Sequence, residues 1–117
     1  MANELQAQYT TGANLYVVVL NSTGQAWTGS VFESINASHW TNYAISLSEQ
    51  AATGIFLGNF PAAITSGGTF NLLLRQRSGG SPAIGDVSIG SRQITWSGSA
   101  EIPPPSGFST LTFGSFK

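Results

Sequence analysis

Apolar and polar residues alternate along much of this chain with a period of two, the spacing at which side chains of a β-strand share a face. Leu5, Ala7 and Tyr9 alternate with glutamate and glutamine, which predicts a strand with one buried side. Residues 15–20 (LYVVVL) are apolar at every position and rich in β-branched side chains. That composition is typical of a central strand that is covered on both faces.

The second half of the chain alternates in the same way. In residues 69–77, Phe70, Leu72 and Leu74 occupy every other position and are predicted to face the core. Residues 86–96 alternate in two halves around Gly90, which we interpret as a β-bulge or bend. Shorter extended segments are expected at 25–27, 30–35, 44–50 and 54–61.

One segment departs from the strand pattern. Residues 36–43 (NASHWTNY) are predicted to form a helical turn, with Asn36 as its N-cap. Seven to eight short strands, frequent turn signals and no long helix predict an all-β protein, a single antiparallel β-sandwich of immunoglobulin-like size with Greek-key connections. We expect this domain to span residues 1–102 and to be followed by an extended arm at 103–117.

The predicted arm begins with a stiff joint, because Pro103, Pro104 and Pro105 favour an extended backbone and lack N–H donors. Four apolar side chains follow the joint, at Phe108, Leu111, Phe113 and Phe116. Residues 109–113 (STLTF) alternate, which predicts a strand that pairs with a sheet edge or groove of a neighbouring copy by β-augmentation. The alternative is that the arm folds back as the last strand of its own domain.

Charge is scarce in this chain. Only 8% of the residues are Asp, Glu, Lys or Arg, and the net charge is −1, whereas an average soluble domain has roughly 25% charged residues. Such a balance attracts the chain neither to nucleic acid nor to an acidic membrane surface. A surface covered mainly by Ser, Thr, Asn, Gln and Gly suits a protein inside an assembly or outside a cell, and we favour the assembly.

The chain contains no cysteine, which excludes a disulfide and a thiolate metal site. No apolar run approaches the about 20 residues needed to span a bilayer. The first residues, MANELQAQYT, lack a cationic region followed by an apolar one, so we expect no secretion signal.

Candidate catalytic residues are few. His39 is the only histidine, and no pattern relates it to the serine and carboxylate of a hydrolytic triad. Glu33 and Glu49 are candidates for a glycosidase carboxylate pair only by elimination. Calcium requires more acidic ligands than Asp86 offers in its loop, and zinc requires histidine or cysteine clusters. We therefore expect no catalytic residue, no metal and no cofactor.

Two sets of residues are candidates for binding. Arg75 and Arg77 lie two positions apart and share a face of their strand. They either solubilise an exposed face and protect an edge strand, or they pair with acidic groups of a neighbouring subunit. Trp40, Tyr43 and Trp27 could form an aromatic platform on which a sugar ring stacks. The competing interpretation is that these large side chains fill the core.

Several stretches along the chain together form a distinctive pattern of turn and core residues. They are GQAW at 24–27, FE at 32–33, Trp40 with YAI at 43–45, Glu49, FPAAI at 60–64, SPAIGD at 81–86 and ITWSGS at 94–99. Together they resemble a small β-sandwich module that recurs in poorly characterised structural proteins of tailed phages and prophages. The likeness covers residues 10 to 102 and includes no catalytic signature.

The resemblance implies a virion component, such as a capsid decoration protein or a tail or baseplate protein, assembled in the host cytoplasm. Its partners would be copies of itself or other virion structural proteins. The alternative is an adhesion module that binds a carbohydrate or a receptor through exposed aromatic side chains.

Overall fold

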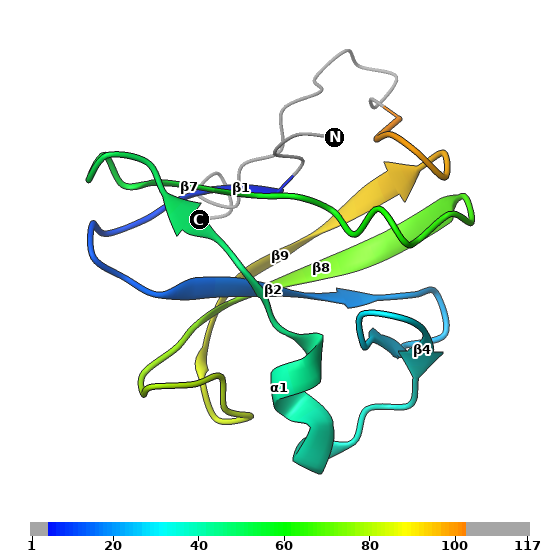
Figure 1. Cartoon of the computed structure of the whole chain (residues 1–117), viewed down its shortest axis with the longest axis horizontal. Helices are drawn as coiled ribbons and strands as arrows, with labels where there is room; N and C mark the ends of the chain where they lie inside the picture. The colour runs from blue at the N-terminus through cyan, green and yellow to red at the C-terminus, as the bar shows by residue number, and fades with distance from the viewer. Residues whose placement is uncertain (1–4, 103–117) are drawn as a thin grey trace.

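The computed structural model of this chain describes residues 5–102, and residues 1–4 and 103–117 lie outside the described part. The described residues form two antiparallel β-sheets that share a core, with a short helical turn at one end (Figure 1). The predicted all-β class and the antiparallel, sandwich-like arrangement are confirmed. The C-terminal arm lies outside the described residues and stays a prediction.

The larger sheet contains six strands in the order β4-β3-β2-β8-β9, with β5 also paired to β2. Their bounds are β2 Leu15–Leu20, β3 Ala26–Trp27, β4 Phe32–Glu33, β5 Ile45–Ser46, β8 Gly68–Gln76 and β9 Val87–Trp96. Strands β2, β3 and β4 follow one another, and β8 returns over a long connection to pair with the free side of β2. This order is that of a Greek key.

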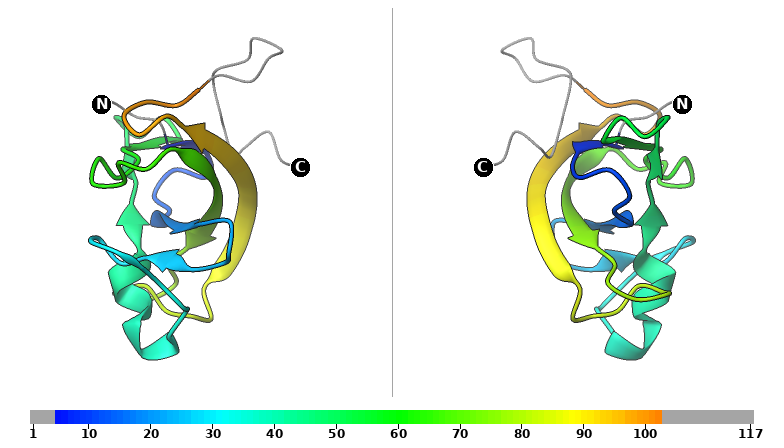
Figure 2. Two further views of the ribbon diagram at one scale, coloured as in Figure 1. Left: turned by 90° about the vertical axis from the view of Figure 1, so that its right-hand side faces the viewer. Right: turned by 90° about the vertical axis from the view of Figure 1, so that its left-hand side faces the viewer.

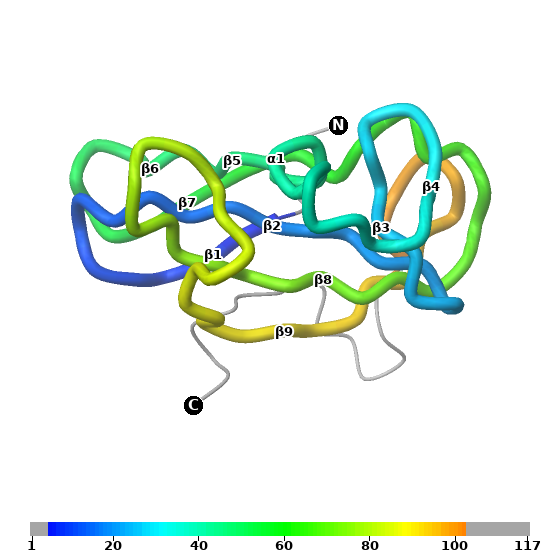
Figure 3. The backbone as a smooth tube through the Cα atoms, turned by 90° about the horizontal axis from the view of Figure 1, so that it is seen from below, coloured from blue at the N-terminus to red at the C-terminus, as the bar shows by residue number. Residues whose placement is uncertain are grey.

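The smaller sheet has three strands in the order β1-β7-β6, namely β1 Leu5–Gln8, β7 Ile55–Gly58 and β6 Ser48–Glu49. Strands β8 and β9 are the longest and curve around the interior (Figure 2). In the perpendicular view, the helical turn α1 (Trp40–Tyr43) and β5 lie on the opposite side of β2 from β9 (Figure 3).

The structure has nine strands where seven to eight were expected, because residues 44–50 divide between the two sheets. Strand β5 pairs with β2 and β6 pairs with β7, and the chain changes sheets at Leu47. The Leu47 N–H donates to the carbonyl oxygen of Leu15 at 3.0 Å, and the Leu47 side chain is buried in the core. The segment thus contributes one two-residue strand to each sheet, and Leu47 links the two strands.

Both faces of β2 are buried, as its unbroken apolar run predicts. Leu15, Val17 and Val19 face the main core between the sheets. Tyr16 and Val18 face a second apolar cluster, which α1 covers with Trp40 and Tyr43. The predicted helical turn is confirmed as the 3₁₀ turn Ala37–His39 followed by α1, and the side chain of Asn36 caps it by accepting from the Ser38 N–H at 3.0 Å.

Strand β9 pairs with β8 through a register shift. Leu74 lies opposite Gly90 and Arg75 lies opposite Ser88, so Ile89 is the additional residue of a bulge. The interpretation of Gly90 as a bulge position is therefore confirmed. Because β8 lies between β2 and β9, the interpretation that Arg75 and Arg77 protect an edge strand is wrong. The edge strand is β9.

Replacing Ile94 by alanine should lower the free energy of unfolding by about 2–5 kcal/mol, because the change removes buried apolar surface and leaves a cavity. Ile94 is 1% exposed in the core, whereas Ile84 is 53% exposed in the loop before β9. Urea unfolding followed by tryptophan fluorescence measures both. Ile84→Ala is the matched control, with an expected change within about 0.5 kcal/mol. Equal losses in the two variants would contradict the described packing.

Candidate functional site

The charged side chains of this protein hold its loops in place. Every Asp, Glu and Arg between residues 5 and 102 makes a hydrogen bond or an ion pair within the chain. Glu49, for example, accepts from the N–H groups of Gly12 at 3.0 Å and Gly54 at 2.9 Å, and thereby joins two loops. These two hydrogen bonds lower the pKa of the Glu49 carboxyl.

A buried polar network connects α1, β2 and the loop between β8 and β9. The indole N–H of Trp40 donates to the Tyr16 hydroxyl at 3.1 Å, and that hydroxyl donates to Oδ2 of Asp86 at 2.7 Å. Asp86 also accepts from the N–H groups of Ala83 at 2.8 Å and Ser78 at 3.3 Å. One carboxylate therefore closes the loop and attaches it to the second apolar cluster.

The pKa values in this network follow from its hydrogen bonds. The N–H of Ala83, followed by the Tyr16 hydroxyl, lowers the pKa of Asp86. Burial, followed by the hydrogen bond to Asp86, raises the pKa of Tyr16 to about 12. Both groups thus keep one protonation state near neutral pH, with Asp86 as acceptor and Tyr16 as donor, which suits a structural pair rather than a proton-transfer pair.

Arg75 belongs to the same region. Its guanidinium lies 5.2 Å from the ring centroid of Trp40, and Nη1 donates to the carbonyl oxygens of Ile84 at 3.3 Å and Asp86 at 3.2 Å. The side chain is therefore engaged within the subunit, and the expectation that Arg75 contacts a neighbouring subunit gains no support.

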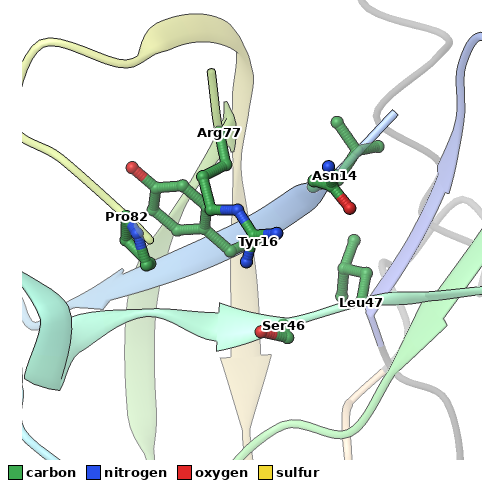
Figure 4. Close-up of a pocket in the computed structure, with 7 residues that line it drawn as sticks. Asn14, Tyr16, Ser46, Leu47, Arg77 and Pro82 are labelled. Carbon is green, nitrogen blue, oxygen red and sulfur yellow. The ribbon is translucent and has the colours of Figure 1, made fainter. Parts of the chain in front are cut away.

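Arg77 lies at a small pocket of about 120 Å³ (Figure 4). Its Nε donates to the carbonyl oxygen of Gly79 at 2.9 Å, which keeps the side chain beside its own loop. Figure 4 shows the Arg77 side chain beside the ring of Tyr16, with Pro82 on the left and Ser46 below. The pocket has room for a group the size of a carboxylate. An acidic contact at Arg77 stays a prediction.

The prediction of an exposed aromatic platform is wrong. Trp27, Trp40 and Tyr43 are 7%, 5% and 0% exposed, because the first packs in the main core and the other two cover β2. Trp27 and Tyr43 do line a hollow of about 350 Å³. With so little of either ring exposed, neither presents a face on which a sugar could stack.

The two candidate catalytic carboxylates are not brought together. Glu33 belongs to β4 and accepts from the Tyr43 hydroxyl at 2.5 Å and from Nδ1 of His39 at 2.9 Å. These contacts, with the Tyr43 hydrogen bond first, lower the pKa of Glu33. Glu49 belongs to β6 in the other sheet. Among residues 5–102 no group of three His, Cys, Asp or Glu could hold a metal ion, and no helix could span a membrane.

The outer edge of β9 is the longest strand edge among the described residues. Strand β9 pairs with β8 on one side only. On its other side the chain folds back antiparallel: Glu101 bridges Trp96, and the Ile102 N–H donates to the carbonyl oxygen of Thr95 at 2.8 Å. The described chain therefore ends beside this edge.

Arg92 points from β9 into the interior and was missed as a site residue. The alternation in the sequence could have identified it, because Arg92, Ile94 and Trp96 lie two positions apart on one face of the strand, and Ile94 and Trp96 are buried. Its Nη2 lies 3.1 Å from Glu101 Oε2, and burial lowers the pKa of Arg92 to about 10. Its buried Nη1 has no hydrogen-bond partner among the described residues.

No known family model, curated protein or solved structure matches this chain. The arrangement of its own residues is therefore the basis for any functional conclusion. That arrangement comprises a rigid sandwich, charges bound internally, and one long strand edge at the point where the described chain ends.

Asp86→Asn should lower the free energy of unfolding near neutral pH. It should also make that free energy decrease less as the pH falls. Because folding lowers the pKa of Asp86, its contribution is present above the unfolded pKa of about 4 and is lost as the pH falls through the folded value. Urea midpoints measured between pH 7 and pH 3 should therefore decrease less in Asp86→Asn than in the unmodified chain.

Tyr16→Phe provides the comparison for that experiment, because it keeps the carboxylate and removes one donor to it. Its acid-dependent decline should begin at the same pH as that of the unmodified chain, but it should end at a higher pH and be smaller, because the folded pKa of Asp86 is lowered less without the Tyr16 donor. Its free energy of unfolding at neutral pH should be about 1–3 kcal/mol lower. An unchanged acid dependence in Asp86→Asn would show that the carboxylate is not bound as described.

Proposed function

We propose that this chain is a non-enzymatic structural protein that associates with copies of itself or with other subunits in a repeating assembly, as a component of a phage virion. The observation that carries the proposal is the distribution of charge. The net charge is −1, and the Asp, Glu and Arg side chains of residues 5–102 are all engaged within the chain. Mutual repulsion, which normally keeps small domains apart, is weak here.

Exposed apolar side chains support the same proposal. Among residues 5–102, seven large apolar side chains are more than one-third exposed: Tyr9, Val31, Ile35, Ile55, Ile84, Val87 and Ile102. Single exposed apolar residues are common on monomers, but here they accompany an unusually uncharged surface. Contact with another subunit would remove this apolar area from water.

The candidate catalytic groups support a role without catalysis. Glu33, Glu49 and Asp86 each accept hydrogen bonds that favour the ionised form and close a local turn or loop. A general acid would need its pKa shifted in the opposite direction. These carboxylates suit a rigid scaffold.

The resemblance to modules of tailed-phage structural proteins supports the assignment to a virion. Its motifs supply residues with structural roles in this fold, such as Trp27, Phe60 and Trp96 in the main core and Asp86 in the buried network. The shared pattern therefore concerns the scaffold. A position in a capsid, a tail or a baseplate would differ in the partners that the scaffold contacts.

Leu111→Ser with Phe113→Ser should weaken self-association about a hundredfold or more. Burial of one such side chain contributes roughly 1.5–3 kcal/mol, and each 1.4 kcal/mol corresponds to a factor of about ten. Sedimentation velocity over a range of concentrations measures the association, and electron microscopy identifies a regular assembly.

The matched control is Thr110→Ser with Thr112→Ser, which changes the other side of the same segment and should leave association nearly unchanged. Tryptophan fluorescence verifies that both double variants keep a folded core. A full-length chain that sediments as a monomer at every concentration would rule out self-association and leave only association with other subunits.

A further inference from the structure

We propose that the outer edge of β9 at residues 91–93 is the docking site for residues 109–113 of a second copy of this chain, which add as a further strand. The inference rests on the proposed function, since it identifies the surface through which copies associate. It follows from the length of this edge, the course of the chain at Glu101 and Ile102, and the side chains that β9 presents.

Strand β9 offers the longest edge among the described strands. It has ten residues, whereas the other described strands with a free edge, β1, β4, β5 and β6, have four, two, two and two. The N–H and C=O groups of alternate residues point to the same side of a strand. Because the carbonyl oxygen of Thr95 accepts from Ile102 on the outer side, the backbone groups of Ser91 and Gln93 face outward as well.

The chain itself is poorly suited to fill these positions. Glu101 lies opposite Trp96, so continuation in the same antiparallel register would bring Pro104 opposite Gln93. Proline has no N–H to donate, and the ladder would lose its hydrogen bond at that point. Residues 103–105 lie outside the described part of the chain, so this step depends on sequence and register alone.

Continuation in the same register would bring residues 111–113 beyond the end of their own β9. An extended chain advances about 3.3 Å per residue, so full extension would put residue 109 roughly 23 Å beyond Ile102. In the same register it would reach Ser88, where the bulge interrupts the regular edge. An extended proline joint therefore presents the alternating segment past the end of its own strand, where another copy can receive it.

The side chains of β9 match the alternating segment. Ile94 and Arg92 are buried on the inner face, and Ser91 and Gln93 are exposed and uncharged on the outer face. A docked strand would therefore place its leucine and phenylalanine beside the inner face and its two threonines beside the outer face. Strand β9 contains neither lysine nor proline, which commonly protect strand edges. The protective features that it does contain are the bulge at Ile89, which lies outside residues 91–93, and the inward-pointing Arg92.

Arg92 supplies a second, independent observation at this edge. Its guanidinium reaches Glu101, which lies on the outer side of β9, so the head group is close to the proposed docking position. The side chain is 7% exposed, and its buried Nη1 has no hydrogen-bond partner among the described residues. A backbone carbonyl oxygen of a docked strand would supply the acceptor that a buried guanidinium requires.

Cysteine cross-linking of the full-length chain tests the proposal, because the unmodified chain has no cysteine. A tagged chain carrying Ser91→Cys or Gln93→Cys is mixed with an untagged chain carrying Thr110→Cys or Thr112→Cys, and the mixture is mildly oxidised. We expect a disulfide-linked tagged–untagged pair on a non-reducing gel in at least one of the four combinations. Its yield should exceed the control several-fold.

The matched control replaces the β9 cysteine by Ser48→Cys, an exposed serine on the edge strand β6. Equal yields with β6 and β9, or no linked pair in any combination, would overturn the docking site. A double variant Gln93→Cys/Thr112→Cys that forms only an internal disulfide would overturn it in favour of the arm folding back on its own domain.

Sedimentation of the unmodified chain separates this inference from the proposed function. If the chain associates and β9 forms no specific cross-link, the docking site is wrong and self-assembly stands. If the chain is a monomer at all concentrations, self-association fails, and docking between copies fails with it.

Discussion

Burial of both faces of β2 is the constraint on which the rest of this structure depends. One face of β2 packs in the core between the sheets, and the other requires a cover of its own. The cover is the helical turn α1, whose Trp40 is hydrogen-bonded through Tyr16 to Asp86 in the loop before β9. Partners on both edges of β2 complete the enclosure. A single apolar strand thus determines where the helix, the loop and the two longest strands lie.

Hydrogen bonds from polar side chains fix the loops around the apolar core. Glu33, Glu49 and Asp86 accept from backbone N–H groups or aromatic hydroxyls, so loops that lack regular structure still have satisfied donors. Glu101 accepts from the Arg92 guanidinium. The cost is that these charges contribute little to the outer surface. Recognition at such a surface depends on shape, on backbone hydrogen bonds and on apolar contact, which are the interactions that an unpaired strand edge provides.

Local patterns predicted the local structure well. The apolar run of β2, the cap at Asn36 and the bulge at Gly90 all depend on residues a few positions apart, and all are confirmed. Contacts between distant residues were not predictable in this way. Tyr16 and Asp86 are 70 positions apart, and their hydrogen bond buries an acid that the sequence presents as an ordinary loop residue. The change of sheets at Leu47 and the interior place of β8 likewise depend on strand order, which alternation does not specify.

Because the charged side chains are bound within the fold, they also affect the rate at which two molecules associate. Complementary charged surfaces can raise association rates to about 10⁸–10⁹ M⁻¹s⁻¹, whereas encounters without such guidance proceed at about 10⁵–10⁶ M⁻¹s⁻¹. A chain whose Asp, Glu and Arg side chains at 5–102 are bound within the fold belongs to the slower regime. For the proposed assembly, the local concentration of copies, rather than electrostatic steering, would then determine when association begins.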